Sequence, residues 1–172
     1  IGHPDKYIDY AAFKVERGDV LGNAIRSGEF QHQLALQRFP KPVDRSLWNM
    51  TPQTVNAYYN PLANQITFPA AILQPPYFDP NADPAVNYGA IGAIIGHEMG
   101  HGFDDQGSMF GPTGKFENWW TDAAKKGFKD RTAALAAQYN AFEPIPGTKI
   151  NGALTLGGNI GDLGVVEAAY AA

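Results

Sequence analysis

The chain has 172 residues, which is enough for one ordinary domain with a hydrophobic core. Its net charge of −4 gives no electrostatic case for nucleic-acid binding, which needs a basic surface. The absence of cysteine excludes disulfides and thiolate metal sites, so a metal must be held by histidine, carboxylate or water. No apolar run approaches the roughly 20 residues of a membrane span, and no signal-peptide pattern is present. Because the sequence starts at Ile1 and ends in a helical pattern, we expect both ends to continue into a longer protein.

The first half of the sequence predicts one helix and one hairpin. Asp19 is a suitable N-cap for a helix to about Gln37, which the following prolines end. Two β-prone runs, 54–59 and 65–68, flank the turn-forming sequence "NPLAN". This pattern indicates a β-hairpin.

The second half predicts three helices. The first follows the cap-and-proline pair Asp83 and Pro84 and extends to about Phe103. Glycines recur along it every three or four residues, which indicates close packing of another backbone, at Gly89, Gly92, Gly96 and Gly100. Two more helices are expected over about 121–143 and from about 156 to the end. The fold class is therefore α+β, mainly helical, with a small β-hairpin.

The sequence "GHEMGHG" over 96–102 carries the strongest chemical signal. Histidines four residues apart lie on one face of a helix, so His97 and His101 can direct both imidazoles at one metal ion. Glu98 is placed to hold a water that the metal activates and to take its proton. The alternative is a buried polar cluster in which the two imidazoles and the carboxylate bond only one another.

The third metal ligand separates the branches of HExxH enzymes. The metzincin pattern needs glycine at 104 and histidine at 107, where this sequence has Asp104 and Gly107. That branch is excluded. The remaining possibility is a carboxylate on a later helix, and the sequence "LTLGGNIGDLG" holds one, Asp162, with Glu167 further on.

Five segments together resemble the neprilysin and endothelin-converting-enzyme family of zinc endopeptidases. They are "VNAYYNP" (55–61), "FPAAILQPPYFD" (68–79), "NYGAIGAIIGHEMGHGFDDQG" (87–107), "NWWT" (118–121) and "NGALTLGGNIGDLG" (151–164). The resemblance implies part of a thermolysin-like zincin catalytic domain over 1–172, with the end of a preceding helical region at about 1–45. It also implies that the rest of the family's chain lies outside this sequence at both ends.

The resemblance assigns roles to seven residues. It implies zinc ligation by His97 and His101, catalysis by Glu98 and Asp162, and binding of the substrate main chain by Asn56 and Ala57. An exposed strand suits that last role, because an extended peptide can pair with it. Asp162 would also accept the other ring N–H of a zinc-ligating histidine, as would Asp104, one turn after His101. For Asp104 an exposed carboxylate at a helix end is an equal alternative.

The sequence departs from the family at one decisive position. Where the family has Gly-Glu-Asn-Ile-Ala-Asp, this chain has Gly-Gly-Asn-Ile-Gly-Asp over 157–162, so Gly158 replaces the ligating glutamate. Gly161 and Val165 also differ from the usual alanine and glycine. Asp162 could reach the metal only if its helix shifted, and it would then leave its histidine.

Three hypotheses follow. The first is a zinc-dependent endopeptidase with one Zn²⁺ per chain that hydrolyses oligopeptides on the amino side of bulky apolar residues. The second is a weakly metal-binding peptide-binding module, impaired because Gly158 removes a ligand. The third is a structural fragment that needs missing segments of the parent protein in order to fold. The resemblance implies an extracytoplasmic location for the parent protein, and a cytoplasmic bacterial form is the alternative.

Overall fold

The computed structural model describes all residues from 1 to 172, and the chain divides into two compact units. The smaller unit comprises residues 4–49 and holds helix α1 (Val20–Arg38). As expected, Asp19 is its N-cap, and the aspartate carboxylate accepts a hydrogen bond from the backbone N–H of Gly22 at 2.9 Å. No residue of α1 is buried. No helix of the chain combines the length and the apolar character needed to cross a membrane.

The larger unit comprises residues 1–3 and 50–172 and contains the predicted hairpin. Strands β1 (Tyr58–Asn60) and β2 (Gln65–Thr67) are antiparallel, with Tyr59 opposite Ile66. Both strands are shorter than the β-prone runs. The turn explains part of this, because the side chain of Asn60 accepts hydrogen bonds from the N–H groups of Leu62 and Ala63.

The predicted helix over 84–103 is present as a continuous path with three parts. These are α2 (Pro84–Asn87), a π-helical segment over Tyr88–Gly92, and α3 (Ala93–Gly100). Asp83 caps the start through a 2.8 Å hydrogen bond from the N–H of Ala85. The helix ends three residues earlier than expected, because the chain turns after His101, whose N–H still donates to the carbonyl of His97.

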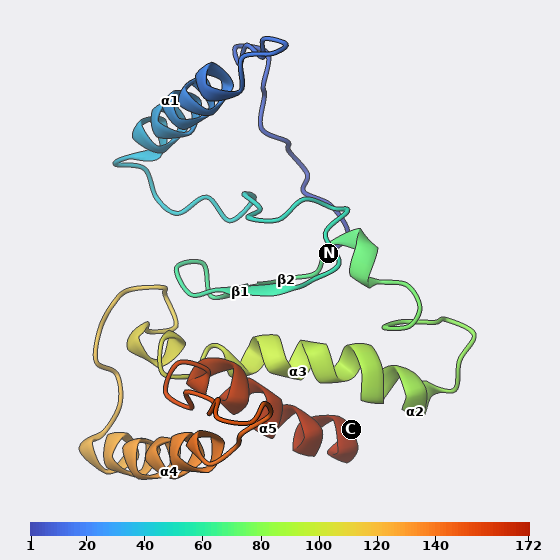
Figure 1. The fold of residues 1–172 in the computed structure, drawn as a ribbon, viewed down its shortest axis with the longest axis vertical. Helices are drawn as coiled ribbons and strands as arrows, with labels where there is room; N and C mark the ends of the chain where they lie inside the picture. Colours follow the sequence, from blue (N-terminus) through green and yellow to red (C-terminus); the bar gives the residue numbers. More distant parts are fainter. The chain divides into compact units, whose positions relative to one another are not determined.

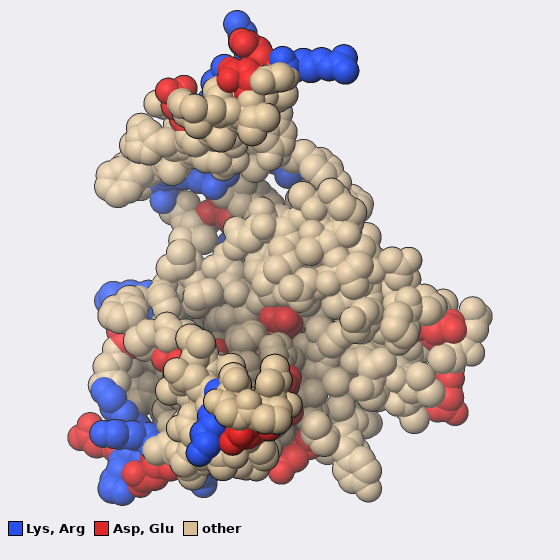
Figure 2. All heavy atoms as spheres, in the orientation of Figure 1, with Lys and Arg blue, Asp and Glu red and all other residues tan.

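The last two helices are also present, α4 (Asp122–Asn140) and α5 (Leu156–Ala171). In the larger unit, the hairpin packs on one side of α3, α5 on the other, and α4 on α5 (Figure 1). Short single helical turns connect these elements over Ala70–Ile72 and Gly107–Met109. Figure 2 shows basic and acidic side chains interspersed over α4. Within this helix, Lys126 Nζ lies 2.7 Å from Asp130 Oδ2.

The core of the larger unit lies between the hairpin region and the α2–α3 path. Its buried members are Ala57, Phe68, Ile72 and Ile91. Ile94 of α3 and Ile66 of β2 pack against this cluster. The core therefore fixes the hairpin against the helix that carries the histidines.

The glycines of α3 do allow close packing of another backbone, as the sequence predicts. A Cβ atom on Gly100 would lie 3.0 Å from the Cα of Gly161, and one on Gly96 would lie 3.5 Å from the Cα of Val165. Helices α3 and α5 therefore cross in backbone contact. This crossing places Asp162, on α5, beside His97, on α3.

Candidate metallopeptidase site

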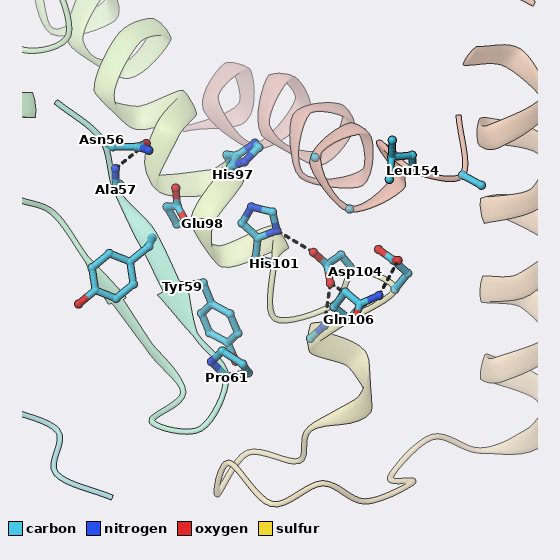
Figure 3. A pocket seen from close by; sticks show the side chains of 16 residues that line it. Asn56, Ala57, Tyr59, Pro61, His97, Glu98, His101, Asp104, Gln106 and Leu154 are labelled. Atoms are coloured by element: carbon cyan, nitrogen blue, oxygen red, sulfur yellow. Dashed lines mark hydrogen bonds and ion pairs between the residues drawn. The ribbon is translucent and has the colours of Figure 1, made fainter. Parts of the chain in front are cut away.

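His97 of α3 and His101, which directly follows α3, lie next to each other and line an open cleft. Their ring centroids are 4.6 Å apart and their planes are nearly perpendicular. The cleft has a volume of about 700 Å³, with α3 on one side and β1 and the segment before it on the other. Figure 3 shows His97, Glu98 and His101 of α3 lining this cleft together with Asn56 and Ala57.

Each imidazole is held by a carboxylate at the same ring atom. Asp162 Oδ1 lies 2.7 Å from Nδ1 of His97, and Asp104 Oδ2 lies 2.6 Å from Nδ1 of His101. These bonds leave Nε2 of each ring for a metal ion, and they orient both rings. The structure thus brings together the two histidine–carboxylate pairs that the resemblance implies.

Asp104 is not the exposed helix-end carboxylate that remained an alternative. It is 4% exposed, and its Oδ1 accepts hydrogen bonds from the backbone N–H groups of Gln106 and Gly107 at 2.8 and 2.7 Å. Oδ1 of Asp104 therefore stabilises the turn after α3, and Oδ2 orients the imidazole of His101.

Glu98 is buried, with 5% of its surface exposed, and its Oε2 has no hydrogen-bond partner. Burial raises the pKa of Glu98, while the imidazoles of His101 and His97 and the backbone N–H of Tyr59 lower it. A buried polar atom without a partner is rare in a structural role. The closed polar cluster, in which these three side chains would satisfy one another, is therefore not what the structure contains.

Asn56 and Ala57 lie immediately before β1 and not within it, so the expected strand is shorter at this end. Asn56 is exposed, and its Oδ1 accepts a 2.9 Å hydrogen bond from the N–H of Ala57. Ala57 itself is buried in the core. Both residues line the cleft opposite the histidines (Figure 3).

Two residues that the sequence reasoning did not single out also line the cleft. Burial and the charge of Asp104 raise the pKa of Tyr59, whose hydroxyl donates to Asn64 Oδ1 at 3.0 Å. Asp105 has a buried Oδ1 without a partner. Its position next to Asp104 in the sequence could have marked Asp105 as a site residue. Only the fold shows that Asp105 lies near Gly157 at the start of α5.

A third protein ligand is missing from this donor set. No group of three or more histidine, aspartate or glutamate side chains in the chain is arranged to hold a metal ion. Gly158 lines the cleft, and a Cβ atom on it would have no neighbour within 4 Å. Imidazole is a ligand that zinc commonly takes, but this chain offers two such ligands where protein zinc sites have at least three protein ligands.

A helix with two histidines flanking a buried glutamate, and a cleft beside a short β-hairpin, have the pattern of the HExxH metallopeptidases. The family model "Peptidase family M13" matches residues 56–172. The chain belongs to this family.

Relatives and solved structures agree with that assignment. The chain is 47% identical to Neprilysin-11 of Caenorhabditis elegans over 181 residues, which cover 100% of this chain and 21% of that protein. It is 40% identical to Neprilysin-3 of Drosophila melanogaster over 177 residues, which cover 99% of this chain and 22% of that protein. The crystal structure of Mycobacterium tuberculosis zinc metalloprotease Zmp1 with an inhibitor matches at 52% identity and a TM-score of 0.89, covering 98% of this chain and 26% of that one. The chain thus spans about a fifth to a quarter of the length of these proteins.

Proposed function

We propose that this chain carries the metal-binding and peptide-binding part of a zinc endopeptidase. The observation that carries the proposal is the pair of imidazoles on α3, each held at Nδ1 by its own carboxylate, around a buried glutamate with an unpartnered oxygen. His97 and His101 would hold Zn²⁺ through Nε2. When bound, zinc supplies a Lewis acid that makes water acidic near neutral pH and polarises a peptide carbonyl.

Glu98 is the general base in this proposal. Its burial favours the protonated form, and the adjacent imidazoles favour the ionised form, so its carboxylate is suited to accept a proton and return it. The unpartnered Oε2 provides the acceptor atom. The proton taken from water then passes to the leaving amine of the cleaved peptide bond.

The substrate is an extended peptide in the cleft between α3 and the segment before β1. Because Oδ1 of Asn56 is engaged by Ala57, the amide NH₂ group of Asn56 remains free to donate to a peptide carbonyl. The proposed partners are therefore an oligopeptide and the remaining segments of a longer parent protein. An extracytoplasmic location of the parent is part of the same proposal.

A second candidate function is favoured by Gly158. With two protein ligands the site would bind zinc far more weakly than a three-ligand site, and the cleft would then bind peptides without cutting them. Both candidates keep Asn56 and Ala57 as peptide-binding residues.

Zinc titration and peptide cleavage, measured together, test the proposal. We expect His97→Ala and His101→Ala each to abolish measurable zinc binding. Glu98→Gln should keep zinc affinity within about threefold but remove all hydrolysis of a peptide with an internal phenylalanine, because the amide cannot accept the proton. Unchanged zinc binding in both histidine variants would overturn the proposal. Binding of the peptide without cleavage by the unmodified chain would select the second candidate.

A further inference from the structure

Helix α5 starts without a cap of its own. Helices α1, α2 and α4 each follow an N-cap residue whose side chain accepts a hydrogen bond from a first-turn N–H. Thr155, the N-cap residue of α5, makes no such bond, and its hydroxyl instead accepts a 2.8 Å hydrogen bond from the side chain of Asn159. The first turn of α5 also contains no acidic residue. Because the first N–H groups of a helix carry partial positive charge and have no helical partner, this end favours a carboxylate from elsewhere in the fold.

The turn after α3 brings two carboxylates to this place. A Cβ atom on Gly157, in the first turn of α5, would lie 3.0 Å from Oδ2 of Asp104 and 3.0 Å from Oδ1 of Asp105. Real Cβ atoms rarely come so close to a neighbour, so the glycine is what lets both side chains reach the backbone at the start of α5. All of these residues belong to the larger unit.

Only one of the two carboxylates has an oxygen left for α5. Both oxygens of Asp104 are engaged, Oδ1 by two backbone N–H groups and Oδ2 by His101 (Figure 3). Oδ2 of Asp105 accepts a 3.2 Å hydrogen bond from the side chain of Gln106, whereas its Oδ1 is buried without a partner. A buried carboxylate oxygen is costly unless positive charge lies near it. The start of α5, beside Gly157, provides that charge.

The place of α5 matters for the site because this helix carries Asp162. Oδ1 of Asp162 lies 2.7 Å from Nδ1 of His97, although 71% of the aspartate side chain is exposed. Its neighbours therefore do little to hold this side chain, and its position follows that of the helix. Asp104, by contrast, lies three residues after His101 in the same turn.

We propose that Asp105 is a positioning residue: its carboxylate holds the start of α5 against the turn after His101 and thereby keeps Asp162 on Nδ1 of His97. One turn then orients both imidazoles, through Asp104 directly and through Asp105 by way of α5. The inference rests on the proposed function for the use of the two imidazoles. The contacts that carry it need no metal, so it is tested on the chain in the presence of a chelator.

Nuclear magnetic resonance of the ¹⁵N-labelled chain at one fixed pH gives the decisive measurement. A hydrogen-bonded imidazole N–H gives a low-field proton signal, and we expect one such signal from each histidine. Asp162→Asn assigns the signal of His97, because it changes that partner alone. Asp105→Asn keeps the size of the side chain and removes its charge. It should abolish the signal of His97 and leave that of His101, whose partner Asp104 does not depend on α5.

Amide hydrogen exchange of the same variant reports the helix itself. Loss of a group that stabilises a helix start corresponds to about two- to thirtyfold faster exchange. We expect this increase in Asp105→Asn for the amides near the start of α5. The amides of α4, which begins at its own cap, Thr121, serve as the internal reference and should be unchanged.

Two neighbouring glycines provide a matched pair of variants. Gly157→Ala should displace the carboxylates, weaken the signal of His97 and, through Asp104, shift that of His101. Gly158→Ala adds the same methyl group one residue further on, where it meets no neighbour within 4 Å. It should leave both signals in place.

A compensating substitution separates the charge at the helix start from a general effect on packing. Thr155→Asp, combined with Asp105→Asn, gives α5 an acidic N-cap of its own. It should restore both the slow exchange of α5 and the signal of His97. Thr155→Val in the same background has a similar shape but no acceptor, and it should restore neither.

Two results would overturn the inference. One is an Asp105→Asn variant in which both imidazole signals and the exchange of α5 are unchanged. The other is the loss of both signals together with faster exchange throughout the chain, which would give Asp105 a general structural role. If the unmodified chain binds no zinc but Asp105→Asn loses the signal of His97 alone, the proposed function fails and the positioning role stands.

Discussion

A hydrogen bond to Nδ1 of each imidazole affects how well Nε2 of the same ring can bind a metal. Asp104 and Asp162 each bond Nδ1 of one histidine, at 2.6 and 2.7 Å. Loss of such a partner typically costs a metal site 10–100-fold in affinity. The two aspartates differ in exposure, since 71% of the Asp162 side chain is accessible to solvent and only 5% of the Asp104 side chain.

We therefore predict different outcomes for the two aspartate-to-asparagine substitutions. Asp162→Asn should lower zinc affinity by about 10–100-fold and leave the melting temperature nearly unchanged, because the exposed side chain has no other bond to lose. Asp104→Asn should lower both, since Asp104 also accepts two backbone N–H groups. Zinc titration and thermal unfolding measure the two effects. Glu167→Gln, an exposed position on α5, is the control, and equal zinc affinity in all three variants would contradict the prediction.

The sequence predicted the roles of some of these residues and left the roles of others open. The spacing of His97, Glu98 and His101 predicted that they face one site, and in the structure all three line the same cleft. The role of Asp104 remained open, because a sequence does not show which way the chain turns after a helix. The consequence of Gly158 could be named from the resemblance, but its open surroundings depend on how α5 packs.

At the scale of elements, signals local to the sequence were the reliable ones. Asp19 and Asp83 cap their helices as predicted, because a cap depends only on the next few residues. Two features were not predicted. These are the π-helical segment over Tyr88–Gly92 and the end of α3 at Gly100. Helix α4 has no buried residue, although α5 packs against it and the ring of Trp120 lies 5.4 Å from that of Phe128.

The crossing of α3 and α5 makes Gly161 a sensitive position. A Cβ atom there would lie 2.9 Å from Nδ1 of His97, closer than ordinary contact. We predict that Gly161→Ala lowers the free energy of unfolding by about 1–3 kcal/mol, as overpacking does, and weakens zinc binding because the ring of His97 must move. Urea unfolding and zinc titration measure these effects.

Gly164→Ala provides the comparison on the same helix. Its added methyl group meets no neighbour within 4 Å, and alanine has a better helix propensity than glycine. It should stabilise α5 by up to about 1 kcal/mol and leave zinc binding unchanged. If both alanine variants behave alike, the close crossing at Gly161 does not constrain His97.

At the scale of the whole molecule, the chain presents much apolar surface. Met99, Phe103 and Phe116 of the larger unit are each more than half exposed. The chain spans 21–26% of the length of the relatives described above. We propose that further segments of a longer parent cover these side chains, which is the expectation of the structural-fragment hypothesis. The two histidines and the carboxylates that bond them, however, all lie within this chain.

All residues that line the cleft belong to the larger unit, and none comes from residues 4–49. We therefore predict that removal of residues 1–49 keeps zinc affinity within about threefold. It should cost about 1–3 kcal/mol of stability, because Gly2 exchanges two backbone hydrogen bonds of 2.8 Å with Phe68 and Ala70. Calorimetric zinc titration and urea unfolding of the shortened chain measure both. In the full chain, Gly2→Pro removes the N–H of Gly2 and cannot adopt its φ of 89°, so it should reproduce part of the stability loss. If the shortened chain keeps its helical circular dichroism but loses zinc binding, residues 1–49 contribute to the site, and the histidine–carboxylate pairs on α3 and α5 are not sufficient to form it.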